Sequence, residues 1–145
     1  MKLNSPVFEN GGDIPSKYTC QGDDISPELL ISDVSEKAVS LILIMDDPDA
    51  PNGMWDHWVV FNIAPNTTKI SEGQEPPGVA GNNSWENTGY GGPCPPSGTH
   101  RYFFKLYALD IELDLLQGSS KSEVESAMEG HVLENVELVG KYQKL

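Results

Sequence analysis

Positive charge is scarce in this chain of 145 residues, which has 9 Lys and Arg residues against 22 Asp and Glu residues. Arg101 is the single arginine, and the formal net charge is −13. Proteins that bind nucleic-acid phosphates independently of base sequence need a cationic surface. The composition therefore predicts no nucleic-acid partner.

Cysteine is also rare, with only Cys20 and Cys94. Two cysteines are too few for a disulfide scaffold, and their spacing does not fit the C-x-x-C pattern of zinc and redox motifs. We predict two free thiols, with a single Cys20–Cys94 bridge as the alternative.

Long apolar runs are absent. The longest, over residues 38–45 and interrupted by Ser40, is far shorter than the ~20 residues that span a bilayer. The first residues, Met-Lys-Leu-Asn-Ser-Pro, show no apolar segment followed by a small-residue cleavage site. We therefore expect a cytoplasmic protein without a membrane span. We also expect no cofactor. The glycines at 89, 91 and 92 do not make a phosphate loop, because the Lys-Ser/Thr pair and the following helix are missing.

The length corresponds to one domain over residues 1–145. Its 14 Gly and 11 Pro residues separate short β-branched and aromatic runs, which predicts a mostly β fold. The main strands are expected at 39–46, 57–64 and 101–109, and shorter candidates at 7–8, 29–31 and 132–142. The first two main strands are apolar nearly throughout, so we expect them in a sheet that is covered on both faces.

One helix is predicted near residue 120. Ser120 and Glu123 have the spacing of a capping box, which satisfies amide groups at a helix start. Apolar side chains then recur on one face at Val124, Ala127 and Met128, with His131 next in the series. We interpret this helix as structural.

Polar side chains gather where the main strands meet loops. They are Asp46, Asp47 and Asp49 after the first strand, His57 at the start of the second, and His100, Arg101 and Tyr102 at the start of the third. If the first strand is antiparallel to the other two, these ends lie on one edge of the sheet. This arrangement predicts the rim of a pocket.

Several chemistries are open to such a rim. The Asp-rich turn at 46–51 is typical of side chains that cap backbone amides. It does not fit a calcium loop, because Pro51 stands at a ligand position. His57 and His100 with an Asp could hold zinc. A hydrolase could use Ser97 or Cys94 as nucleophile with a histidine base, although no G-x-S-x-G motif is present.

A small-anion site fits the residues better. Imidazoles titrate near pH 6.5 and can donate hydrogen bonds to phosphate or carboxylate oxygens. Tyr102 adds a hydroxyl, and the loop at 91–98 can expose amides such as that of Cys94. Asp47 could orient an imidazole, or it could pair with the ammonium group of a zwitterionic ligand.

Two motifs extend this prediction. Asp47-Pro48-Asp49-Ala50-Pro51 matches D-P-D-x-P, and Gly98-Thr99-His100-Arg101 matches G-x-H-R. With Tyr-Thr-Cys-Gln-Gly at 18–22, Ile-Ser-Pro at 25–27 and the Gly/Pro segment at 91–98, they resemble the short prokaryotic branch of the phosphatidylethanolamine-binding proteins, also called Raf kinase inhibitor proteins. The similarity runs from about residue 3 to residue 142.

The resemblance implies a large central antiparallel sheet, a second small sheet and a few peripheral helices. It also implies a pocket for phosphate, acetate or a phospholipid head group such as phosphoethanolamine. By position, the ligand-binding residues would be Asp47, His57, Cys94, Pro95, Pro96, His100 and Tyr102. The residues that structure the motif loops would be Asp49, Pro51, Trp55, Gly98 and Arg101.

We therefore expect a non-catalytic anion-binding protein. The alternatives are an inhibitor of a protease or kinase that uses the loops at 66–90 or 91–99, and a hydrolase or metalloenzyme that uses His57 and His100. The resemblance further implies that two copies can pair as a homodimer.

Overall fold

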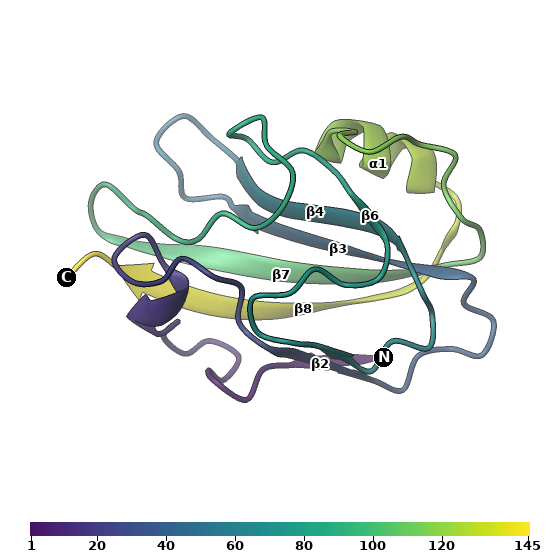
Figure 1. Cartoon of the computed structure of the whole chain (residues 1–145), viewed down its shortest axis with the longest axis horizontal. Helices are drawn as coiled ribbons and strands as arrows, with labels where there is room; N and C mark the ends of the chain where they lie inside the picture. Colours follow the sequence, from purple (N-terminus) through teal and green to yellow (C-terminus); the bar gives the residue numbers. More distant parts are fainter.

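A five-stranded antiparallel sheet dominates the computed structural model, which describes all residues from 1 to 145 (Figure 1). Its strand order is β6-β4-β3-β7-β8. The strands are β3 (Ser40–Asp47), β4 (Trp55–Ile63), β6 (Val79–Ala80), β7 (Thr99–Leu109) and β8 (Val132–Gln143). The three main strands predicted from sequence are confirmed with ends shifted by one or two residues, and the predicted segment at 132–142 forms β8.

A second, three-stranded antiparallel sheet has the order β1-β2-β5. Its strands are β1 (Lys2–Asn4), β2 (Leu29–Ser32) and β5 (Lys69–Ile70). The expected short strand at 7–8 is wrong, because this segment bends and Phe8 packs its ring against Phe104 in the core. The combination of one large and one small sheet matches the expected fold class.

Strand β3 lies at the centre of the large sheet, and all eight of its residues are buried. Successive strand residues point to opposite faces. Leu41, Leu43 and Met45 join a 19-residue core cluster that also contains side chains of the small sheet. Ile42 and Ile44 join an 8-residue cluster on the other face, under the helix. The prediction that both faces are covered is confirmed.

The predicted helix is α1 (Lys121–Met128). Ser120 accepts from the Glu123 amide at 3.1 Å, and Glu123 accepts from the Ser120 amide at 3.1 Å, which completes the capping box. Val124 and Met128 are buried against the sheet. His131 lies beyond the helix end and instead places Nδ1 2.9 Å from Asp110, so its assignment to the helix face was wrong.

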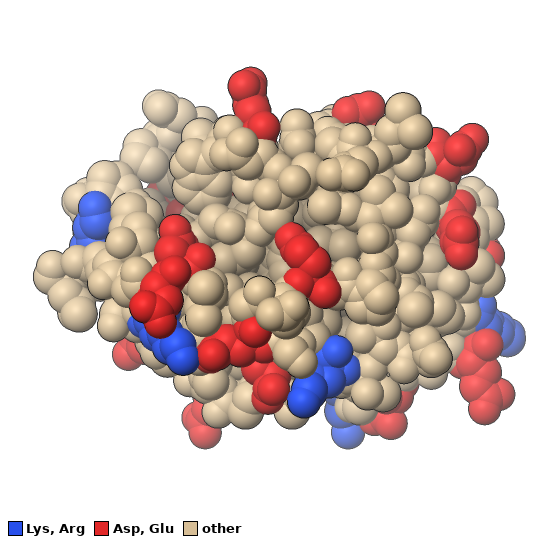
Figure 2. Space-filling model, in the orientation of Figure 1, with Lys and Arg blue, Asp and Glu red and all other residues tan.

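The only other helical segment is the single 3-10 turn η1 (Ser16–Tyr18). No helix in the chain combines the length and apolar character that a membrane crossing needs. Acidic side chains outnumber basic ones on the face in Figure 2, as the net charge of −13 leads one to expect.

Candidate functional site

A cavity of about 530 Å³ lies at the end of the large sheet where β3 ends and β4 and β7 begin. The structure brings all seven expected ligand-binding residues to its wall: Asp47, His57, Cys94, Pro95, Pro96, His100 and Tyr102. The antiparallel pairing of β3 with both neighbours explains this convergence. It places the end of one strand beside the beginnings of the other two.

His100 is fixed by a short contact with Asp47. Its Nδ1 lies 2.7 Å from Oδ2 of Asp47, and both side chains are buried. The other carboxylate oxygen, Oδ1, accepts from the backbone amide of Asp49 at 2.7 Å. Because both oxygens of Asp47 have protein partners, the geometry favours orientation of the imidazole over pairing with a ligand ammonium group. Nε2 is the nitrogen of His100 that is left for the cavity.

His57 sits at a β-bulge in β4. Met45 pairs with Trp58 and Asp46 pairs with Asp56, so His57 is the extra residue between them. Bulges of this kind redirect a side chain and are common beside functional sites. The Nδ1 atom lies 2.7 Å from the carbonyl oxygen of Gly91, which can only accept. Nδ1 therefore carries the proton, and Nε2 of the neutral ring is a free acceptor.

The ring of His57 packs edge-on between two aromatic side chains. Its centroid lies 5.2 Å from that of Tyr102 and 5.0 Å from that of Trp85. Burial lowers the pKa of His57 below its usual value, while the Gly91 carbonyl and the charge of Asp47 oppose this shift. The neutral form of this imidazole is therefore favoured in the folded protein.

Tyr102 presents a buried hydroxyl that has no hydrogen-bond partner within the protein. Burial raises the pKa of Tyr102, and the charge of Asp47 adds to the rise. The backbone amide of Cys94 acts in the opposite sense, but it does not make a hydrogen bond of good geometry with the hydroxyl. A buried polar group without a partner is unfavourable. Its position on the cavity wall is that of a group that a ligand would satisfy.

The two motif loops are joined by Asp49 and Arg101. Nε and one terminal nitrogen of the guanidinium each donate to a different carboxylate oxygen at 2.9 Å, and the Arg101 amide donates to Oδ2 at 2.9 Å. These hydrogen bonds lower the pKa of Asp49 to about 2. Gly98, with φ of +69°, permits the turn that leads into the second motif. The contacts between Asp49 and Arg101 thus join the two motif loops.

Residues 4–143 match the family model described as phosphatidylethanolamine-binding protein. The chain belongs to the phosphatidylethanolamine-binding protein family.

Relatives and solved structures agree with this family membership. A UPF0098 protein of Methanothermobacter thermautotrophicus is 53% identical, and the match covers 99% of each chain. The crystal structure of a phosphatidylethanolamine-binding protein homologue from Chlamydia trachomatis has a TM-score of 0.96 at 44% identity, over 99% of this chain and 97% of that one. E. coli YbcL has a TM-score of 0.91 at 28% identity, over 99% of this chain and 98% of that one.

Not every polar residue at the strand ends reaches the cavity. Asp46 points to the opposite face from Asp47, since consecutive strand residues alternate. Its Oδ2 lies 2.9 Å from the ammonium of Lys105 and 2.8 Å from that of Lys121. The placement of Asp46 at the pocket rim was therefore wrong, and the residue instead fixes α1 to the sheet.

The two cysteines form a disulfide with a Cα–Cα distance of 5.4 Å, and neither is free. The expectation of two free thiols was wrong, and the alternative that we left open is observed. The sequence spacing did not reveal the contact because 74 residues separate the two positions. Cys94 is consequently not available as a thiol nucleophile while the bond is intact.

The geometry also bears on the remaining enzyme alternatives. No group of three or more His, Cys, Asp or Glu side chains is arranged to share a metal ion. Ser97 is exposed and does not line the cavity. The zinc and serine hypotheses therefore lack the arrangement of residues that each would need.

Sequence reasoning missed part of the cavity wall, above all Trp85. This side chain comes from the loop after β6, where Asn83 Oδ1 accepts from the Trp85 amide at 2.9 Å. Ser84 and Asp56 exchange hydrogen bonds of 2.8 Å that fix the loop to β4. Other lining residues that we did not single out as ligand-binding are Ala50, Pro51, Asn52, Gly53, Met54, Trp55 and Ser84.

Proposed function

We propose that this protein binds a small anion of the phosphate or phospholipid head-group class and does not catalyse a reaction. The observation that carries the proposal is the convergence of three groups on one cavity. They are the free Nε2 atoms of His57 and His100 and the unpartnered hydroxyl of Tyr102. All three are side chains that can bind phosphate oxygens.

The tautomers of the two histidines support coupling between anion binding and protonation. Each Nδ1 faces an acceptor, so each Nε2 lacks a proton when its ring is neutral. A phosphate oxygen and a bare Nε2 are both acceptors and repel each other. Binding therefore requires a proton on the imidazole or on the phosphate, and the complex takes up that proton wherever the separate partners lack it.

The remaining wall supports a ligand with an organic part. Pro95, Pro96, Met54 and Trp85 offer apolar surface, and Asp47 is the single charged residue in the lining. Three or four charge-assisted hydrogen bonds of roughly 1.5–3 kcal/mol each, less an association cost of at least about 4 kcal/mol, correspond to millimolar to micromolar affinity. Contact of an organic group with the apolar wall would add to this.

A non-catalytic role is supported by the lack of an activated nucleophile beside the histidines. Cys94 is bonded to Cys20, and no serine or threonine hydroxyl accepts from or donates to either imidazole. Phosphatase and esterase screens of the wild-type protein test this part of the proposal. Turnover that is lost in His100→Ala would overturn it.

Calorimetric titration with O-phosphoethanolamine, inorganic phosphate and ethanolamine tests the binding. We expect both phosphates to bind, O-phosphoethanolamine more tightly, and ethanolamine not at all. His100→Gln should weaken binding at least about tenfold, whereas His131→Gln, which changes a histidine outside the cavity, should not. A crystal soaked with O-phosphoethanolamine should show density between the two Nε2 atoms. Equal affinity in wild type and His100→Gln would reject the site.

A further inference from the structure

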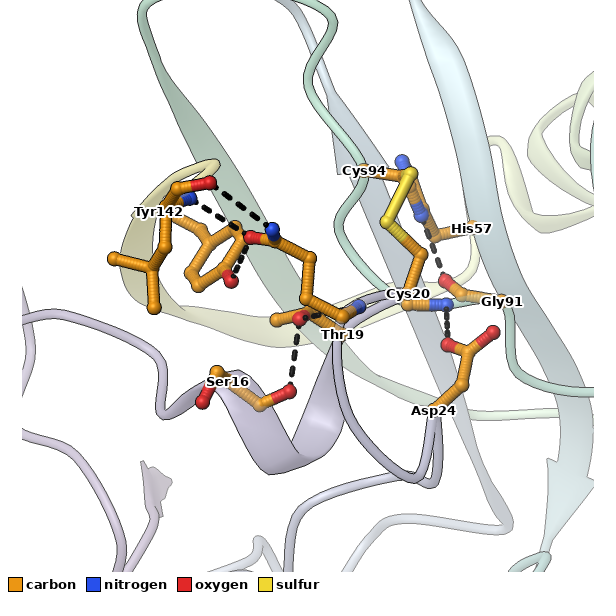
Figure 3. The surroundings of a disulfide bond; sticks show 11 residues. Ser16, Thr19, Cys20, Asp24, His57, Gly91, Cys94 and Tyr142 are labelled. Atoms are coloured by element: carbon orange, nitrogen blue, oxygen red, sulfur yellow. Dashed lines mark hydrogen bonds between the residues drawn. A yellow bond between two sulfur atoms is a disulfide. The ribbon is translucent and has the colours of Figure 1, made fainter.

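The Cys20–Cys94 disulfide forms part of the partition between two cavities. Cys94 and Trp85 line the anion cavity and also a neighbouring cavity of about 470 Å³, and Cys20 lines only the neighbouring one. Figure 3 shows the disulfide with the hydrogen bond between His57 and Gly91 beside its Cys94 end. The Cys94 end of the bond thus belongs to the candidate anion site, and the Cys20 end lines the neighbouring cavity.

Both cysteines are exposed to solvent. Thiol–disulfide exchange requires that an incoming thiolate reach one of the two sulfur atoms. The neighbouring cavity gives such access, since both cysteines line it. The bond therefore meets the steric requirement for exchange in the folded protein.

The disulfide also holds the segment that orients His57. Gly91, whose carbonyl accepts from His57, lies three residues before Cys94. The Cys20 side of the bond is itself anchored, because the Gln21 side chain accepts from the hydroxyl of Tyr142 at 2.5 Å and from the Leu145 amide at 2.9 Å. The bond thus links the cavity wall to the end of β8 (Figure 3).

We propose that the Cys20–Cys94 disulfide is a thiol–disulfide exchange site, with a dithiol as reactant, whose state sets the affinity of the anion cavity. The proposal rests on the anion-binding function proposed above. One thiolate of the dithiol attacks Sγ of Cys20, which forms a mixed disulfide and releases Cys94 as a thiolate that takes up a proton. The second thiolate then displaces Cys20, so the dithiol is oxidised to a disulfide and both cysteines become thiols.

Reduction should loosen the cavity wall without unfolding it. The Cys20 amide still donates to the Pro93 carbonyl at 3.1 Å, and the Gly92 amide still donates to Asp24 at 2.8 Å. These hydrogen bonds keep the segment around Cys94 near its position, but the disulfide no longer restricts its movement. Movement of Cys94 would join the two cavities and displace the carbonyl of Gly91 from His57. We expect anion affinity to fall by about three- to tenfold.

The test compares oxidised and dithiothreitol-treated wild-type protein under native conditions. Mass spectrometry after N-ethylmaleimide quenching should count no free thiol before treatment and two after it. Titration with O-phosphoethanolamine should then give a dissociation constant about three- to tenfold higher for the reduced protein. Cys20→Ser, which breaks the bond but leaves the Cys94 side chain in the wall, should bind like the reduced protein and should not respond to dithiothreitol.

Histidine ring resonances give a readout that does not depend on a ligand. Those of His57 should move on reduction, and those of His131 should stay unchanged, because His131 contacts Asp110 outside the cavity. Reduction only after denaturation, or identical affinity and His57 resonances in both states, would overturn the inference. If neither state binds O-phosphoethanolamine, the proposed function fails, and the His57 resonances alone decide whether the bond acts on the cavity.

Discussion

Nδ1 of His100 lies 2.7 Å from Oδ2 of Asp47, although 53 residues separate the two in the chain. Both side chains are at least nine-tenths buried. In this setting the carboxylate orients the ring and selects the tautomer that carries its proton on Nδ1. The same negative charge is unfavourable for a bound anion, so the two effects compete.

Asp47→Asn separates these effects, because asparagine keeps the shape and removes the charge. The Asp47 carboxylate contacts Nδ1 of His100 directly. An anion bound at Nε2 would lie on the other side of the imidazole ring, farther from the carboxylate. We therefore expect loss of the imidazole's orientation to dominate, and anion affinity at pH 7 to fall by up to about tenfold, the usual range for one lost hydrogen bond. Calorimetry measures the change. Asp110→Asn is the matched control, since it removes the carboxylate from His131; tighter binding by Asp47→Asn would show that repulsion dominates.

Anion affinity should decrease as pH rises from about 5.5 to 8. Where the imidazoles are neutral and the phosphomonoester is a dianion, the complex holds a proton more than the separate partners, because each cavity-facing Nε2 is then unprotonated. Uptake of one full proton changes the dissociation constant by about tenfold per pH unit. Titration in buffers of different ionisation enthalpy counts the protons directly. A dissociation constant that is the same at pH 5.5 and pH 8 would contradict this protonation scheme.

Stability should respond to pH in the opposite direction through His57. Its pKa is lowered by burial in the folded protein, so the unfolded chain binds more protons near pH 6. The stabilisation that comes from the neutral ring is therefore present above about pH 6.5 and is lost as pH falls below that value. We expect the melting temperature of the ligand-free protein to decrease between pH 7.5 and pH 5. His57→Gln should reduce this decrease, whereas His131→Gln should not.

The sequence predicted those parts of the site that local motifs encode. The D-P-D-x-P and G-x-H-R segments end and begin neighbouring strands, so strand pairing alone brings Asp47 and His100 together. Trp85 could not be predicted in this way, because its position depends on a loop that is held by Asn83 and Ser84 rather than on strand periodicity. The bulge at His57 and the disulfide are likewise set by tertiary packing. The pattern of residue types along the chain therefore predicts neither the bulge nor the disulfide.

Asp46 and Asp47 are adjacent in sequence, but we expect Asp46 to control stability and Asp47 to control anion affinity. Asp46 is fully buried and binds the ammonium groups of Lys105 and Lys121. Asp46→Asn would leave Lys105 without its carboxylate and Lys121 with only Oδ1 of Asp56 at 3.3 Å, and breaking a buried ion pair costs about 3–5 kcal/mol. Urea unfolding should show a loss of this order, while the anion affinity of the folded variant stays within about twofold of wild type, since Asp46 faces away from the cavity. A large loss of affinity without loss of stability would contradict the assignment of the two faces.

Removal of the disulfide should lower stability independently of any ligand. The bond joins residues 74 positions apart, and its loss frees the unfolded chain from a loop of that length. Chain entropy gives about 4 kcal/mol for such a loop at 25 °C. Urea unfolding of the double variant Cys20→Ser, Cys94→Ser should show a loss of this size, and reduced wild-type protein should match it, because both lack only the crosslink. A loss below about 1 kcal/mol would mean that the unfolded chain is already compact around these positions. The double variant could instead lose the expected ~4 kcal/mol of stability and still bind the anion with wild-type affinity. The bond would then have a purely structural role, and its control of the cavity would be excluded.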